Sequence, residues 1–123
     1  MSKKLVFLFL STAIFFSFPE NALLANEKPQ EAMDRVRLFS IKVLEKSLKS
    51  ENAFIRSAAA RAVGESEDYE LIPLLKKAAT DSYHTTRLFA LQGIKKISLD
   101  EARVMSVQMT QDLNVWVRGS AIQ

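Results

Sequence analysis

The chain has 123 residues, of which 17 are lysine or arginine, 14 are aspartate or glutamate and none is cysteine. This length allows one domain at most. The absence of cysteine excludes disulfides, thiol catalysis, zinc–thiolate sites and lipid attachment to a leader cysteine. A net charge of only +3 does not favour a nucleic-acid binder, in which basic residues gather strongly on one face.

The N-terminal segment, residues 1–25, is typical of a secretory signal peptide. Lys3 and Lys4 precede an apolar run, Leu5 to Phe18, which Pro19 breaks. The run is shorter than the roughly 20 residues that a membrane-spanning helix needs. We therefore predict a cleaved leader over residues 1–25, with the cut after Ala25. A buried N-terminal helix is the alternative, and the many phenylalanines of the run argue against it.

Removal of the leader leaves a polar linker over residues 26–30 and a net charge of about +2. The remaining chain has no cysteine and no Asn-x-Ser/Thr acceptor for glycosylation. These features predict a bacterial protein exported to the periplasm or the medium, with a fold that is stabilised by packing alone. No membrane span is expected after cleavage.

The rest of the chain predicts an all-α fold of about five or six helices, because no stretch alternates between apolar and polar residues as a strand does. The expected helices run from residue 31 to about 49, over 53–63, over 69–80, from 85 to about 97, from 102 to about 110, and from 115 to 123. Gly64 is expected to end the second helix with a positive φ. Ser98 and Glu101 form a capping box. The first helix is apolar over more than half its circumference, so it is expected to have neighbours on two sides.

A sequence repeat organises these helices. Arg56, Arg87 and Arg118 are evenly spaced, and an alanine follows each of them at the third position: Ala59, Ala90 and Ala121. Asp81 and Asp112 stand at the sixth position before the second and third arginine, while Ser50 fills that place in the first copy. A fixed period of about 31 residues indicates stacked structural repeats. We divide the segment 31–123 into a partial repeat 31–49, repeats 50–80 and 81–111, and a partial repeat 112–123.

The pattern resembles the HEAT repeat family, most closely its PBS-lyase HEAT-like variety, in which an aspartate in a turn precedes an arginine and an Ala-rich helix. The segments Asp81 to Ile94 and Asp112 to Ile122 carry this pattern, and Ser50 to Gly64 carries it without the aspartate. The resemblance implies a superhelical solenoid of helix pairs. It also implies that the arginines and aspartates form a structural ladder that holds the repeats together.

The sequence offers no catalytic, cofactor-binding or metal-binding residues. His84 is the only histidine, and a lone histidine near a helix start is usually solvated or part of a cap. Deoxyhypusine hydroxylases, which also have HEAT-like repeats, bind iron through His-Glu pairs, and Val63-Gly64-Glu65 stands in the comparable place here. The carboxylates of Glu65 to Glu70 are explained by a helix start, which favours negative charge. We therefore expect a protein that is not an enzyme.

Recognition of another protein is the predicted function. The second helix of each pair in such a solenoid is exposed, and we expect five basic residues to form a strip there that binds an acidic segment of a partner: Arg35, Lys42, Lys46, Lys76 and Lys77. The alternative is an ordinary solvated face. A second function class stays open, namely a protein related to the phycobilin lyases that handles a tetrapyrrole or lipid through apolar residues near Trp116.

The C-terminal end leaves Val115, Trp116 and Ile122 without an obvious cover, and burial of each would contribute roughly 1.5–3 kcal/mol. Three interpretations are open. The chain is a piece of a longer protein, or this end pairs with another copy or a partner, or the short last helix folds back and covers itself.

Overall fold

The computed structural model describes residues 28–123. The predicted signal peptide, residues 1–25, lies outside the described residues. Contacts divide the chain into two units, Met1–Leu38 and Phe39–Gln123, and the packing that follows is that of the second unit.

The described residues are all-helical, and the predicted all-α class is confirmed. Six α-helices lie between residues 28 and 123: α3 (Pro29–Leu48), α4 (Ala53–Glu65), α5 (Ile72–Ala78), α6 (His84–Ile97), α7 (Leu99–Met109) and α8 (Val115–Ile122). A 3₁₀ turn, Tyr69–Leu71, precedes α5. Helix α3 begins at Pro29, inside the range predicted as a linker, because proline fits the first turn of a helix.

Side chains cap several of these helices, and the cap at Ser98 is one that the sequence predicts. The Asn52 Oδ1 accepts from the Phe54 backbone N–H at 2.9 Å at the start of α4. Ser98 accepts from the Glu101 N–H at 3.4 Å, which is the forward half of the predicted capping box. The reverse half is absent from the described residues, because the Ser98 N–H donates to the Ile94 carbonyl and the Glu101 carboxylate pairs with Lys76 at 2.7 Å.

The end of α4 differs from the prediction for Gly64. The helix continues through Gly64 to Glu65, and no described glycine has a positive φ. The residue with positive φ is Glu67, at 53°. Gly64 is needed for another reason. It lies against Gly93 of α6 where the two helices cross, and a Cβ on Gly64 would stand only 2.6 Å from the Gly93 Cα.

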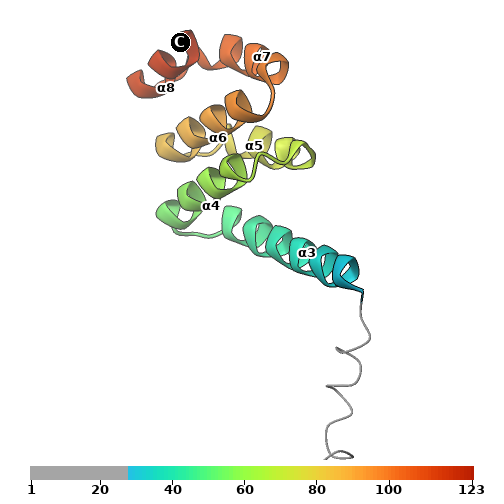
Figure 1. Ribbon diagram of the computed structural model, residues 1–123. Helices are drawn as coiled ribbons and strands as arrows, with labels where there is room; N and C mark the ends of the chain where they lie inside the picture. The colour runs from blue at the N-terminus through green and yellow to red at the C-terminus, as the bar shows by residue number, and fades with distance from the viewer. Residues whose placement is uncertain (1–27) are drawn as a thin grey trace, which may run out of the picture. The chain divides into compact units, whose positions relative to one another are not determined.

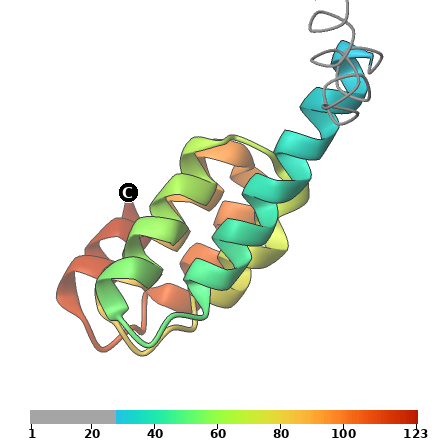
Figure 2. The same ribbon diagram turned by 90° about the horizontal axis from the view of Figure 1, so that it is seen from below.

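The second unit is built from two layers of helices. Helices α4, α6 and α8 follow one another in one layer, and α5 and α7 lie in the other (Figures 1 and 2). Helix α6 is central, since it contacts α4, α5, α7 and α8. The order along the chain therefore alternates between the layers.

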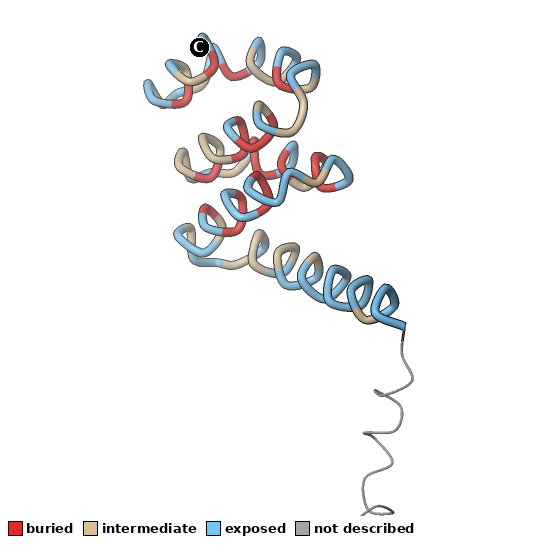
Figure 3. Tube along the Cα trace, viewed as in Figure 1, coloured by how far each residue is buried: buried red, intermediate tan, exposed pale blue. Residues whose placement is uncertain are grey.

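Buried residues gather where the helices of the second unit face one another (Figure 3). One cluster joins residues of α4, α6 and α8 with residues at the ends of α5 and α7, and Ala60, Ala90, Leu91 and Val117 are among its members. The other is formed by Val63, Leu71, Leu75, Ile94 and Ala102. The alanines that recur with the arginine repeat, Ala59, Ala90 and Ala121, are all buried. Their small side chains let neighbouring helices lie close together.

Within the second unit, α3 packs through one side. Ile41, Leu44 and Leu48 lie partly buried against the second cluster. Phe39 and Val43 are exposed, so the neighbours on two sides that the apolar circumference predicts are absent from the segment 39–123.

We predict that Gly64→Ala and Gly93→Ala each lower the free energy of unfolding by about 1–3 kcal/mol, because the added methyl group forces α4 and α6 apart. The matched control is Gly119→Ala in α8, where an added Cβ meets nothing within 4 Å. That substitution should raise stability by about 0.5–1 kcal/mol through helix propensity. Denaturant titration measures all three, and equal effects at the three sites would contradict the close crossing.

Candidate functional site

Arg56, at the start of α4, holds two turns of the chain together. Its Nε and Nη2 donate to the two carboxylate oxygens of Asp81 at 2.7 and 3.0 Å. Its Nη1 donates to the backbone carbonyls of Ser50 and Glu51 at 2.9 and 3.0 Å. We call this arrangement an arginine clamp: two carbonyls of the preceding turn and one carboxylate of the following turn accept from a single guanidinium.

Arg87, at the start of α6, makes a second clamp with the equivalent partners one repeat later. Its Nε and Nη2 donate to the Asp112 carboxylate, both at 2.7 Å. Its Nη1 donates to the carbonyls of Asp81 and Ser82 at 2.8 and 3.0 Å. The forked guanidinium matches the carboxylate in plane and spacing, which makes this one of the stronger side-chain contacts in proteins.

Arg118, at the start of α8, makes the carbonyl half of the clamp. Its Nη1 donates to the carbonyls of Asp112 and Leu113 at 2.8 and 3.0 Å. Within the described range, 28–123, its Nε and Nη2 have no carboxylate partner. The predicted ladder residues Arg56, Asp81, Arg87 and Asp112 are thus brought together in pairs, and Arg118 is not paired with an acid there.

The clamps shift the ionisation of their members. The hydrogen bond from Arg56 holds the pKa of the Asp81 carboxyl below its ordinary value of 3.8, and the Tyr83 backbone N–H adds to this effect. The hydrogen bond from Arg87 lowers the pKa of Asp112 in the same way. The same contacts raise the pKa values of Arg56 and Arg87. The four groups therefore stay charged near neutral pH, where none of them takes up or releases a proton.

The five residues of the predicted basic strip lie in different settings. Lys42 and Lys46 are exposed on α3, and Lys77 is exposed on α5. Lys76 pairs with Glu101 of α7 at 2.7 Å, so its charge is already matched. Arg35 belongs to the first unit and is exposed there.

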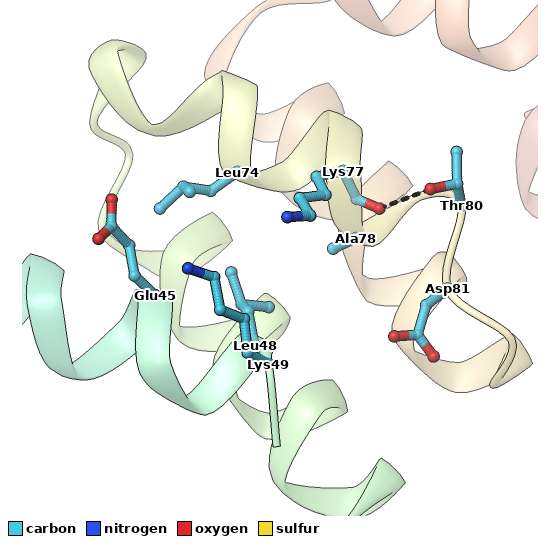
Figure 4. A pocket seen from close by; sticks show the side chains of 8 residues that line it. All are labelled: Glu45, Leu48, Lys49, Leu74, Lys77, Ala78, Thr80 and Asp81. Carbon is cyan, nitrogen blue, oxygen red and sulfur yellow. Dashed lines mark hydrogen bonds between the residues drawn. The ribbon is translucent and has the colours of Figure 1, made fainter. Parts of the chain in front are cut away.

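A pocket of about 360 Å³ lies between the last turns of α3 and α5. It is lined by Glu45, Leu48, Lys49, Leu74, Lys77, Ala78, Thr80 and Asp81. Figure 4 shows Lys77 extending toward the pocket from α5, and Lys49 extending toward it from the turn that follows α3. The predicted strip does not include Lys49. Helix α3 ends just before Lys49 and brings it opposite Lys77.

The charges around this pocket favour an acidic ligand. Asp81 is already neutralised by Arg56, and Glu45 is the remaining carboxylate of the lining. Lys49 and Lys77 make no ion pair with any residue from 28 to 123. Leu48, Leu74 and Ala78 supply an apolar floor. Two ammonium groups over an apolar floor suit a short segment that carries both carboxylates and apolar side chains.

Among the described residues, no cluster of three or more His, Cys, Asp or Glu side chains is placed to bind a metal ion. Nor does that part of the chain contain a helix with the length and apolarity needed to cross a membrane. Compared with the models of known protein families and with curated proteins, the chain matches none.

We predict that Asp112→Asn lowers the free energy of unfolding by about 1–2 kcal/mol, since it removes the charge from a mostly buried forked contact that solvent still partly screens. Asparagine keeps the acceptor for the Asn114 N–H, which Asp112 Oδ1 accepts at 2.8 Å, so the turn is preserved. The control is Arg61→Gln, which breaks an exposed pair with Glu65 and should cost no more than about 0.5 kcal/mol. Chemical denaturation at neutral pH compares the two variants.

The clamps also predict how stability depends on pH. Because folding depresses the pKa of Asp81 and Asp112, their contribution is complete above the ordinary value of 3.8 and is lost as the pH falls below it. The free energies of unfolding of the wild type and of the Asp81→Asn/Asp112→Asn variant should therefore converge as the pH is lowered from neutral to below 3.8. A stability difference that stayed constant over this range would show that the two carboxylates are not selectively stabilised in the fold.

Proposed function

We propose that this chain is a non-enzymatic interaction module built from HEAT-like helical repeats, exported to the bacterial envelope or periplasm, which binds an acidic segment of a partner protein. The binding surface is the pocket between α3 and α5 together with the exposed lysines that adjoin it on α3. The observation that carries the proposal is the convergence of Lys49 and Lys77, free of ion pairs within the described range 28–123, on one pocket with an apolar floor.

The repeated clamp supports the part of the proposal that concerns a helical-repeat solenoid. Arg56 reaches Asp81 and Arg87 reaches Asp112, each across the same separation in sequence and through the same guanidinium atoms. Each clamp thus ties the start of one helix in the α4–α6–α8 layer to the turn before the next. A stack in which each unit contacts its neighbours in this way presents a continuous face for binding.

The placement of the lysines supports an acidic partner over a nucleic acid. The basic groups near the pocket are lysines, which act as flexible point charges, whereas the arginines at the helix starts are held in the clamps. Glu45 also lies in the pocket lining, where it would repel the evenly spaced phosphates of a nucleic acid. A protein segment with one or two carboxylates places its charges away from Glu45.

The test is capture of partners from the exported fraction by the chain expressed from Met1, compared with a Lys49→Gln/Lys77→Gln variant. We expect the wild type to retain a partner in a manner that a glutamate-rich peptide competes and that added salt weakens. The variant should bind the partner about tenfold more weakly, as the loss of two lysine contacts worth roughly 0.5–1 kcal/mol each implies.

The matched control is Lys96→Gln/Arg103→Gln, which removes the same number of positive charges from exposed positions outside the pocket, where Lys96 pairs with Glu67 and Arg103 with Asp100. The control should bind as the wild type does. Equal weakening by both variants would mean that net charge alone explains the effect. Partner binding by the Lys49/Lys77 variant as strong as that of the wild type would show that the pocket is not the binding surface.

A further inference from the structure

The end of the α4–α6–α8 layer offers a second surface, separate from the pocket between α3 and α5. Arg118 makes the same two carbonyl contacts as Arg56 and Arg87, through the same Nη1 atom. In those two residues, Nε and Nη2 hold a carboxylate. In Arg118 the two corresponding donors have no acceptor within the segment 28–123, although the guanidinium is already fixed in position by its carbonyl contacts.

One apolar residue of α8 stands at a position that is buried one repeat earlier, and another stands at a position that contacts the next turn two repeats earlier. Leu91 of α6 is fully buried in the first core cluster, against α8. Ile122 holds the equivalent place one repeat later and is 77% exposed. Phe54 of α4 packs edge-on against Tyr83, in the turn before α6, with 5.8 Å between ring centroids. Trp116 holds the place of Phe54 two repeats later, and both side chains are 72% exposed; Trp116 differs in that no aromatic ring of a following turn packs against it within the segment 28–123.

Helix α8 therefore does not fold back over its own apolar side chains. Its Trp116, Arg118 and Ile122 occupy the positions at which α4 and α6 contact the turn and the helix that follow them. We call these three residues the α8 end face. The clamps also define what such a face accepts, because both bound aspartates are presented in the same way.

Each clamped aspartate lies three positions before the first residue of a helix, His84 or Val115. Its Oδ1 also accepts from the backbone N–H two positions later, at 2.8 Å from Tyr83 and from Asn114. The carboxylate is thereby aimed at the arginine, and the helix that follows supplies apolar side chains to the core.

We propose that the α8 end face binds a helix of a partner protein that is preceded by an aspartate in such a turn. The partner's carboxylate takes the Nε and Nη2 of Arg118, its turn packs against one side of Trp116 as Tyr83 does against Phe54, and its helix covers Ile122. A second copy of this chain does not fit this description. Its Asp81 and Asp112 are already held, and Ser50 stands where the first repeat would have an aspartate.

A peptide cut from this chain itself provides the probe. The segment 69–97 contains Asp81 followed by the α6 sequence, and it contains no tryptophan, so Trp116, the single tryptophan of the chain, reports on the end face alone. The peptide is synthesised with Gln92→Glu joined to Lys96 by a lactam, which fixes its helix on an exposed side. It is titrated against the purified chain expressed from Met1.

We expect saturable binding and a saturable change of Trp116 emission, because the Tyr83 ring of the peptide packs against the indole as it does against Phe54 in the chain. The same peptide with Asp81→Asn should bind at least tenfold more weakly, and so should the unchanged peptide to an Arg118→Lys chain. The two changes together should add little to either one, because they remove the same contact. The Lys49→Gln/Lys77→Gln chain should bind the peptide unchanged, which separates this surface from the one proposed above.

Equal affinity for the peptides with and without the Asp81→Asn change would overturn the role of the carboxylate, and the absence of any saturable change in Trp116 emission would overturn the end face as a binding surface. A shift of Trp116 emission with rising concentration of the chain alone, measured together with its sedimentation, would make a second copy the occupant and would overturn the assignment to a different partner.

Discussion

The forked contact between an arginine at a helix start and an aspartate before the next helix is the interaction on which the second unit depends. Arg56 and Arg87 each join three parts of the backbone that are separate in the sequence: the turn before the helix, the helix itself, and the turn that precedes the next helix of the same layer. The turns carry carbonyls that their own helices do not satisfy. A guanidinium, with five donors in a rigid plane, can satisfy them and a carboxylate at the same time.

The clamps fix the starts of α4 and α6 relative to the turns beside them. Small residues then allow the rest of these helices to pack closely. Ala60 and Ala90 are fully buried between helices, and Gly64 meets Gly93 at a distance that excludes any side chain. Thr86 is one residue whose burial in this arrangement lowers stability. It stands where the other repeats have Ile55 and Val117, it is fully buried, and its hydroxyl finds no partner among the described residues.

The two proposed surfaces use positive charge in different ways. Lysines at the pocket between α3 and α5 keep their flexibility and suit a ligand recognised mainly by charge. Arg118 at the α8 end face is held by two backbone carbonyls and suits a carboxylate presented in one orientation. The two surfaces are separate, since one lies between α3 and α5 and the other lies on α8.

The sequence by itself determined the all-helical class, the helix starts at Ala53 and Val115 to the residue, and the identity of the clamp residues, because caps, apolar periodicity and the spacing of the arginines are local or periodic signals. It did not determine which charged side chains remain available. Lys76 is matched by Glu101 of α7, and Lys49 lies opposite Lys77 only because α3 and α5 pack together. The role of Gly64 was likewise decided by Gly93, which lies on a different helix. Contacts between helices depend on how closely their backbones approach one another. The spacing of repeated residues along the sequence does not give that distance.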